Sequence, residues 1–526
     1  MSVEFRALSG SLTGKSLSPD DALAQYKNMP DVYKKSVSSD VFVAYFSNQL
    51  RDTILWHDYE GTGDKPSRDQ ATQFAGVRTT FELDVIDCPI DIYCKPNLDM
   101  MPHPIAVAIT KISPMKCLRD GLPEFDFAQI IQDEFMLSGT NGTAYNGVKY
   151  DDELTRYTNF RNFIPPYDRE NGQGRGRWDL LPLVAMFRGL RPAGIEWPTN
   201  ELGKNSIKLE LIAKENNIVQ VNSHNAVYDC LATVSTAKLL RKSNQKLYDY
   251  IFSNRKKHSV ASQVTLGQPL VHAKTVFGGE RHFCSPVLPI CYSTADKNVI
   301  FAIDLHSTDK TWLNLSAEEL KARVYSKKAE LEESGHQRPP IVQIKINQCP
   351  ALAPIKTMIG AEERLGVTLE QVGQLCREYN EPNVFGHTAS LLLEAFGHWG
   401  KFDKPELAEQ DLYGGFIKGS DKELSEMIQI SGLDHAVKQG LNFLDPRLAE
   451  IFPRMIGRNK PKLLDDAQLA QWIHFVKERL TKEIHDGDGR INLTNYEQAL
   501  EDSDMPKELV DEYIEYVNLI KAKLSL

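Results

Sequence analysis

The feature that most limits the fold is a change of apolar periodicity along the chain, from mixed to strand-like to helical. From Thr53 to about residue 244, strand-like runs alternate with stretches of helical period, which is typical of an α/β domain. The first run, TILWHDYE, is apolar at its start and charged only at its end, as expected of a buried central strand. Helical period follows in several segments, namely DFAQIIQDEFML, DELTRYTNFRNF, DLLPLVAMFRGL, IKLELIAKENNI and AVYDCLATVSTAKLLRK.

The rest of the chain has a different character. Residues 245–400 hold short β-like runs broken by Pro and Gly, which predicts a small barrel-like sheet with helical insertions. Residues 401–526 carry amphipathic stretches and few strand signals, so we expect a helical C-terminal domain. Residues 1–50 are polar and Ser-rich and predict an extension, disordered or with a short helix at 19–27. The predicted α/β domain therefore occupies residues 51–244.

Composition and cysteine spacing exclude several classes of protein. Of the 526 residues, 41% are hydrophobic and 25% are charged, as in ordinary globular proteins. The sequence contains no run of about eighteen apolar residues, so it predicts no membrane-spanning helix. The first thirty residues lack the apolar core of a signal peptide. The eight cysteines have no close-paired spacing, which indicates buried or free thiols in a reducing cytoplasm and disfavours a zinc site.

The net charge of −10 is distributed unevenly. Residues 461–526 hold fourteen Asp and Glu against eight Lys and Arg. Residues 238–258, by contrast, contain seven Lys or Arg and one Asp. A second basic cluster consists of Arg169, Arg175, Arg177, Arg188 and Arg191. Because local patches decide where a polyanion docks, either cluster is a candidate nucleic-acid surface, and a solvated face is the alternative for each.

Two short motifs resemble known ligand loops but do not fit them. SGSLTGKS has one residue too few between its glycines for a phosphate-binding P-loop, and no strand precedes it. HDGDGRINL resembles a calcium loop, yet aligning Gly489 with the sixth loop position places Ile484 first and Asn495 twelfth, and neither is a carboxylate. We interpret the second motif as a surface loop.

Five ionisable residues, by contrast, form a coherent set, listed in chain order as Asp58, Glu60, Asp151, His224 and Asp229. Residues i and i+2 of a strand point the same way, so the first two carboxylates project together from the end of one buried strand. Two carboxylates held together away from water repel each other, and a cation relieves that repulsion. Hard oxygen ligands favour Mg²⁺ or Mn²⁺, and two such ions suit the cleavage of a phosphodiester.

Each of the five has a simpler interpretation when taken alone. Asp58 and Glu60 could form a solvated strand end, and Asp151 could be the N-cap of a helix. His224 could be a surface histidine, although its ordinary pKa also suits a general base. Their order along the chain favours the joint interpretation, a site that hydrolyses phosphodiesters.

The motifs around these residues resemble a known family. A D-x-E pair, then N-x3-Y-D, then H-x4-D is similar to the pattern of the DEDDh 3′→5′ exonucleases. The segments HDYEGTG, QFAGVRT, YCKP, RWDLLPL, LRPAGIEWP, HNAVYD and INQCPALAP further resemble bacterial exonuclease I. The resemblance covers roughly residues 52–526 and is strongest before residue 300.

This resemblance implies a ribonuclease H-like exonuclease domain, a Src-homology-3-like barrel and a helical domain. It implies that Asp58, Glu60, Asp151 and Asp229 are metal ligands for two Mg²⁺ ions, which Mn²⁺ could replace, and that His224 is the general base. The implied activity is processive 3′→5′ digestion of single-stranded DNA to 5′-mononucleotides, in repair and recombination. An exonuclease that trims RNA 3′ ends and a non-catalytic single-strand-binding scaffold remain the alternatives.

Other expectations concern what the protein binds. Candidate substrate contacts, each with a core or solvated role as the alternative, are Phe74, Arg177, Trp178 and Lys208. The resemblance also implies a partner, the acidic C-terminal tail of a single-stranded DNA-binding protein, for which Arg255, Lys256 and Lys257 are candidate contacts, with a solvated turn as the alternative. We expect a cytoplasmic monomer that does not associate with membranes.

Overall fold

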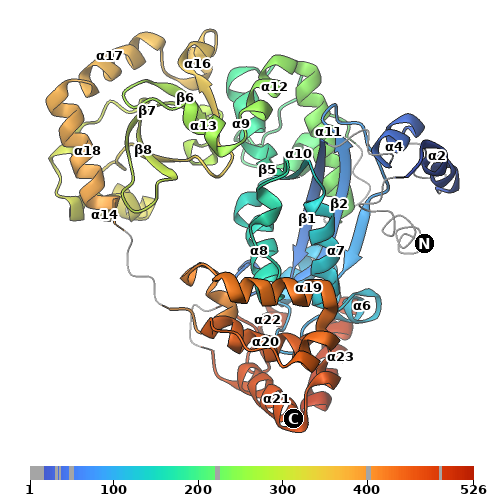
Figure 1. Ribbon diagram of the computed structural model, residues 1–526. Helices are drawn as coiled ribbons and strands as arrows, with labels where there is room; N and C mark the ends of the chain where they lie inside the picture. The colour runs from blue at the N-terminus through green and yellow to red at the C-terminus, as the bar shows by residue number, and fades with distance from the viewer. Residues whose placement is uncertain are drawn as a thin grey trace. The chain divides into compact units, whose positions relative to one another are not determined.

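The computed structural model describes residues 17–29, 34, 37–46, 52–218, 225–398, 404–484 and 489–525. It groups the chain into two compact units (Figure 1). Unit 1 comprises residues 1–176, 220–234 and 404–526, and unit 2 comprises residues 177–219 and 235–403. Segments that are distant in sequence therefore fold together, and the helical C-terminal part belongs to the same unit as the first strands.

A five-stranded sheet with the order β3-β2-β1-β4-β5 carries the α/β part. Strand β1 (Thr53–Gly61) pairs antiparallel with β2 (Ala71–Thr80) and parallel with β4 (Thr140–Ala144). The edge strands are β3 (Ile90–Tyr93) and β5 (Gly176–Asp179). The predicted central strand is thus confirmed as β1, and the predicted α/β class is confirmed with it.

Helices cover this sheet. Helices α7 (Glu124–Met136) and α8 (Asp151–Arg161) supply apolar side chains to one core cluster with β1 and β2. Its largest members include Phe74, Phe127 and Phe135, all fully buried. The start of α11 (Ala226–Ser243) lies against β2, where the Cys230 thiol approaches the Ala75 carbonyl oxygen at 3.7 Å. Both faces of β1 are therefore covered, which explains why its sequence is apolar over most of its length.

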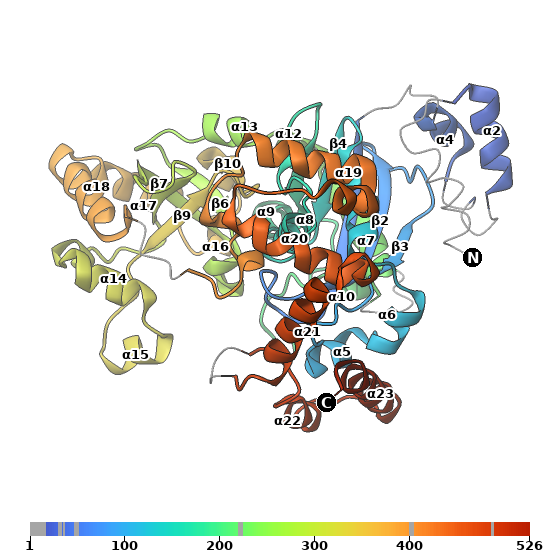
Figure 2. The same cartoon turned by 60° about the horizontal axis from the view of Figure 1, so that its bottom comes forward.

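The C-terminal helices of unit 1 pack on the α/β part through two apolar clusters. They are α19 (Gly419–Gln439), α20 (Pro446–Asn459), α21 (Asp466–Thr481), α22 (Tyr496–Glu501) and α23 (Lys507–Leu524). Figure 2 shows α22 and α23 beside α5 (Pro104–Thr110) and α6 (Pro114–Asp120). The Tyr513 hydroxyl of α23 donates to the Pro102 carbonyl at 2.7 Å, so the contact is polar as well as apolar.

Unit 2 is built on a second sheet, in which every pair of neighbouring strands is antiparallel, with the order β10-β6-β7-β8-β9. Its strands are β6 (Leu270–Ala273), β7 (Cys284–Tyr292), β8 (Val299–Asp304), β9 (Ile341–Lys345) and β10 (Ala351–Pro354). The helices of this unit are α9 (Leu180–Leu190), α10 (Leu209–Glu215), α12 (Gln245–Ser253), α13 (Lys257–Ser262), α14 (Ala317–Tyr325), α15 (Lys328–Glu333), α16 (Glu362–Leu365), α17 (Leu369–Tyr379) and α18 (Pro382–Phe396). The expected small sheet with helical insertions is present.

The described part of the N-terminal extension contains two helices, α2 (Pro19–Asn28) and α4 (Ser39–Phe46). The first matches the short helix expected from the sequence, and the Ser18 hydroxyl caps it by accepting from the Asp21 amide. All eight cysteines are buried and free, as predicted. Among the described residues, no helix combines the length and apolar character needed to cross a bilayer.

A buried ion pair fastens the α/β part of unit 1 to its C-terminal helices. The carboxylate of Asp99 accepts from Arg458 of α20 at 3.0 and 2.8 Å, and both side chains are almost fully buried. Burial opposes the charge of Asp99, but Arg458 outweighs it and lowers the pKa of Asp99 to about 2. The pair therefore stabilises unit 1 only while Asp99 is ionised.

We expect Asp99→Asn to lower the free energy of unfolding by about 3–5 kcal/mol, because it removes a carboxylate from two buried arginines, Arg458 and Arg479, and leaves Arg458 with Glu409 alone. The difference in the free energy of unfolding between wild type and the variant should be largest above pH 3.8, the ordinary pKa of Asp. It should shrink as the pH falls towards 2, because native Asp99 then becomes protonated. Urea unfolding at several pH values measures both effects. Asp120→Asn is the matched control, because its pair with Arg119 is exposed; an equal loss in that variant would refute the assignment.

Candidate active site

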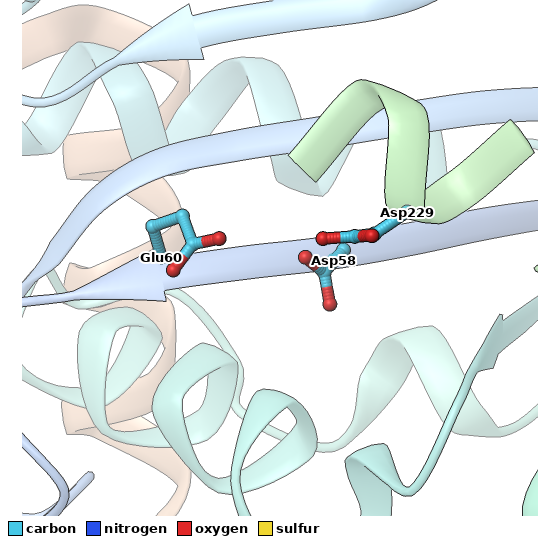
Figure 3. Close-up of side chains that lie close together, drawn as sticks. All are labelled: Asp58, Glu60 and Asp229. Atoms are coloured by element: carbon cyan, nitrogen blue, oxygen red, sulfur yellow. The ribbon is translucent and has the colours of Figure 1, made fainter. Parts of the chain in front are cut away.

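Three carboxylates meet at the C-terminal end of β1 (Figure 3). Asp58 and Glu60 project from the same face of the strand, and Asp229 reaches them from the first turn of α11. One oxygen of each lies within 4.8 Å of the others. Residue 58 pairs with Ala75 of β2, whose small side chain leaves room on this face. The structure therefore brings together residues that are about 170 positions apart in sequence.

Asp151 belongs to the same cluster, since its charge acts on both Asp58 and Glu60. It is the first residue of α8, where a negative charge is favourable to the helix dipole. Its carboxylate accepts a hydrogen bond from the Tyr59 amide at 3.1 Å, so the backbone of β1 fixes its position. The side chain of Asp151 is 6% exposed. Four carboxylates thus converge in one place, with Asp151 buried and the other three half-buried.

This concentration of negative charge changes the titration of the cluster. Burial and the neighbouring charges of Asp151, Glu60 and Asp229 raise the pKa of Asp58 well above its ordinary range. Burial, followed by Asp229 and Asp151, raises the pKa of Glu60 to about 8. Carboxylates that repel one another away from bulk water lower the stability of the folded protein unless a cation neutralises them. An all-oxygen donor set of this kind fits a hard divalent cation such as Mg²⁺ or Mn²⁺.

Hydrogen bonds of neighbouring side chains fix the positions of the elements that carry the carboxylate cluster. The Arg169 guanidinium donates to Asp152, the neighbour of Asp151, at 2.6 Å, and both side chains are buried. The Tyr150 hydroxyl donates to the Gly63 carbonyl at 2.7 Å, which ties the start of α8 to the end of β1. Sequence reasoning missed both contacts. The doublet Asp151–Asp152 was the available signal, because two adjacent acids cannot both face the same site at a helix start.

The arginine cluster predicted as a nucleic-acid surface is mostly internal, which corrects that prediction. Arg169, Arg175 and Arg188 are 1%, 9% and 3% exposed. Arg175 donates to backbone carbonyls, including that of Met136, and Arg188 donates to the Ser206 carbonyl at 2.9 Å. A guanidinium has five donors that internal oxygens can satisfy, so arginines that are close in sequence need not form a surface patch.

The four candidate substrate contacts have different environments. Phe74 is fully buried beside Tyr59, and Trp178 is 4% exposed and packs on Phe252, so neither ring is accessible for stacking on a base. Arg177 is half-buried and donates to the Asn347 carbonyl. The side chain of Lys208 is 71% exposed and lies 3.7 Å from Glu210. Only the two cationic residues remain accessible for such a role.

Two further predictions lie outside the described residues. His224 falls in the gap between 218 and 225, directly before the helix that carries Asp229. The calcium-like loop includes residues 485–488, which also fall in a gap. The structure therefore positions four of the five predicted residues, and His224 stays a prediction from the sequence.

Three family models match successive parts of the chain. The model described as Exonuclease matches residues 55–236. The Exonuclease I SH3-like domain matches residues 255–387, and the Exonuclease I C-terminal domain matches residues 406–520. Together they cover the α/β part, the second sheet and the C-terminal helices.

Proteins similar to this chain over most of its length include exodeoxyribonucleases I from several bacteria. The Exodeoxyribonuclease I of Haemophilus influenzae is 36% identical over 434 residues, which cover 81% of this chain and 90% of that protein. That of Escherichia coli is 32% identical over 441 residues, covering 83% and 92%. The crystal structure of E. coli Exonuclease I in complex with a dA16 oligonucleotide superposes with a TM-score of 0.82 at 30% identity, covering 89% of this chain and all of that one. The identity and coverage, together with the carboxylate cluster, show that this chain belongs to the exodeoxyribonuclease I family.

Proposed function

We propose that this protein is a divalent-metal-dependent 3′→5′ exonuclease that degrades single-stranded DNA to 5′-mononucleotides. The observation that carries the proposal is the convergence of four carboxylates at the end of β1, of which Asp151 is buried and Asp58, Glu60 and Asp229 are half-buried. The polarity and the substrate are supported by family membership and by the oligonucleotide complex of the E. coli relative. Processive action and a role in repair and recombination are part of the same proposal.

The four carboxylates would hold two Mg²⁺ ions, or Mn²⁺ in their place. When bound, such ions supply a water of lowered pKa and offset the charge that develops on the leaving oxygen. A related E. coli structure is described as a zinc ion bound form, which supports a site for divalent ions in the family. The Tyr59 amide keeps Asp151 oriented through its hydrogen bond, so this carboxylate would be positioned before any ion binds.

His224 would accept the proton of the attacking water, since a neutral imidazole is the ordinary base near neutral pH. It precedes α11 by two residues and Asp229 by five, so the same segment would deliver the base and a ligand. The carboxylates are only partly exposed, so charge interactions around the scissile phosphate would be stronger there than in bulk water.

The remaining expectations stay proposals. We propose domain boundaries near residues 50, 244 and 400, a cytoplasmic monomer, and contacts from Arg177 and Lys208 to the DNA strand. We also propose that the acidic tail of a single-stranded DNA-binding protein docks on residues 255–257. In that segment Lys257 is exposed, whereas Arg255 lies over the Phe252 ring at 3.9 Å.

Digestion of labelled strands tests the proposed function. A 5′-labelled DNA oligonucleotide incubated with the protein and Mg²⁺ should give a ladder that shortens from the 3′ end. The same strand labelled at the 3′ end should release labelled mononucleotide at once, and an RNA strand of the same sequence in the same tube should persist. Intact DNA after long incubation would contradict the proposal, and preferred loss of RNA would favour the RNA-trimming alternative.

A glycine beside the cluster gives a further prediction. A Cβ on Gly61 would lie 2.0 Å from the Tyr150 hydroxyl oxygen, so Gly61→Ala must displace either the end of β1 or the start of α8. We expect at least a tenfold loss of nuclease activity, because a displacement of about 1 Å at a positioned site can cost about a hundredfold.

The double variant Gly61→Ala with Tyr150→Phe provides the control. Without the hydroxyl, the nearest Tyr150 atom, the ring carbon that carries it, is 3.2 Å from the added Cβ, so most of the clash is relieved. Steady-state digestion rates of the single and double variants should therefore differ, with the double variant closer to wild type. Equal rates in both would show that the close approach does not position the ligands.

A further inference from the structure

A second polar site lies in unit 1, in a pocket between the loops that follow β1 and β3 and the C-terminal end of α21 (the α21 pocket). The residues that matter for its chemistry are Thr62, Arg68, Asp69, Asp99, His103 and Arg479, with Arg490 beside them. None of them belongs to the carboxylate cluster. The pocket brings together residues from positions 62–103 and 479–491, all within one compact unit.

The most informative side chain is Arg479. Its side chain is 6% exposed, and its nearest carboxylate, that of Asp99, is 3.9 Å away. Asp99 is already engaged by Arg458 at 3.0 and 2.8 Å. The Nη1 atom of Arg479 is buried without a hydrogen-bond partner among the described residues. A buried guanidinium with an unsatisfied donor is costly, and an anion in the pocket removes that cost.

Four other groups in the lining are also donors. The His103 ring accepts from the Ile105 amide through Nδ1 at 3.2 Å, so Nε2 carries the proton of the neutral ring. The Thr62 hydroxyl accepts from the Gln70 amide at 2.9 Å and keeps its own proton for donation. Arg68 and Arg490 add two guanidinium groups with side chains 10% and 13% exposed. These donor groups favour the binding of an anion over the binding of a metal ion.

The two carboxylates in the lining do not reverse this preference. Both oxygens of Asp99 accept from Arg458. The oxygens of Asp69 accept from the Arg68 side chain at 3.2 Å and from the Lys65 amide at 2.7 Å. Their charges are thus already matched, and the charge of Arg479 remains in excess. Burial accordingly lowers the pKa of Arg479, despite the opposing effect of Asp99.

The size and position of the α21 pocket limit the anions that it can bind. The cavity volume is about 20 Å³, little more than one water-sized group, so it admits one oxygen of a tetrahedral oxyanion and no base or sugar. Thr62 follows Glu60 by two residues, so their Cα atoms are separated by at most about 7 Å. The α21 pocket therefore borders the chain segment that carries Glu60. We propose that the α21 pocket binds one terminal phosphate group, with Arg479 as its principal donor.

The phosphate has two sources that the geometry fits equally, inorganic phosphate and the 5′-phosphate of a released mononucleotide. The link to the released mononucleotide rests on the proposed function, whereas the binding site itself does not. Occupancy would also bridge the loop after β1 to α21 and thereby stabilise unit 1.

Binding can be measured on the full-length protein in EDTA, where no digestion occurs. Inorganic phosphate is titrated at constant pH and ionic strength, with chloride as the balancing anion, and the thermal unfolding midpoint is recorded. Wild type should show a saturable rise. Arg479→Met should lose at least tenfold in phosphate affinity, because one charge-assisted hydrogen bond is removed. Arg119→Gln, at an exposed arginine of the same unit, should behave as wild type.

Phosphate also stabilises proteins generally by exclusion from their surface, and that effect does not saturate and is common to all variants. An equal saturable rise in wild type and Arg479→Met would overturn the proposal. If Arg479→Met fails to fold, Arg490→Gln takes its place under the same criteria, because that side chain lies at the edge of the same pocket.

Three competitors identify the source of the phosphate. Thymidine 5′-monophosphate should compete with inorganic phosphate, whereas thymidine should not. A single-stranded oligonucleotide without a terminal phosphate should not compete either. If it does compete, the pocket binds an internal phosphodiester, and the proposal of a terminal-phosphate site is refuted. Phosphate is titrated in EDTA and digestion is assayed separately in Mg²⁺, so failure of the nuclease proposal and failure of this one are separable.

Discussion

Replacing Asp58 with asparagine is expected to reduce 3′-end digestion by at least about 10³-fold. Asp58 belongs to the cluster with Glu60 and Asp229 and is half-buried, so the amide removes one ligand charge with little change in the shape of the site. The loss of one ligand removes several kcal/mol of charge stabilisation in the transition state, and each 1.36 kcal/mol corresponds to about a tenfold change in rate.

The same substitution should make the metal-free protein more stable, which separates this site from an ordinary structural carboxylate. In the absence of an ion, Asp58 repels Asp151, Glu60 and Asp229, and that repulsion is lost in the variant. The thermal midpoint in EDTA should therefore rise while activity in Mg²⁺ is lost. Asp64→Asn is the matched control, because that side chain is 82% exposed and only four residues from Glu60. Retained turnover in Asp58→Asn, or a fall in its midpoint, would contradict the ligand assignment.

Removal of divalent ions is the second change with a large expected effect. Chelation with EDTA should abolish digestion, and Mg²⁺ or Mn²⁺ should restore it. The effect on stability should depend on pH. In the folded protein the pKa of Glu60 is raised from 4.5 to about 8, so between these values the folded state holds more protons than the unfolded state. The stability of the metal-free protein should consequently fall as the pH rises from about 4.5 to 8.

An ion competes with those protons, so it should bind more tightly, and stabilise more, as the pH rises across the same range. The rise in thermal midpoint on adding Mg²⁺ should thus be larger at pH 8 than at pH 6. Scanning calorimetry at both pH values, with Asp58→Asn as the variant that should show a smaller rise, measures the effect. A rise that is equal at both values, or undiminished in the variant, would show that the ion binds elsewhere.

The sequence was most reliable where a local pattern has a direct structural consequence. The apolar run that ends in two acids predicts a buried strand with both acids on one face, and β1 has that arrangement. The short helix after Ser18 and the free cysteines were equally predictable, because a cap and the absence of paired spacing are local properties. The family resemblance extended these local inferences to most of the chain.

Charge and aromatic residues were less informative, because their environment depends on the rest of the fold. Arg169 belonged to a predicted surface patch, yet it is buried against Asp152. Phe74 was a candidate stacking residue, yet its ring packs at 4.8 Å from that of Tyr59. A guanidinium or an aromatic ring can be satisfied inside or outside the protein, and the sequence around it does not distinguish the two.

The sequence by itself determined the order and identity of the acids at the site, the α/β class of the segment that carries them, and the helical character of the C-terminal part. Only the tertiary structure decided that Asp229 meets Asp58, that the C-terminal helices share a compact unit with the first sheet, and that one donor of Arg479 finds no partner among the described residues. The reason is physical. Local pattern fixes the direction of a side chain relative to its own strand or helix, whereas contacts between residues hundreds of positions apart depend on how those elements pack.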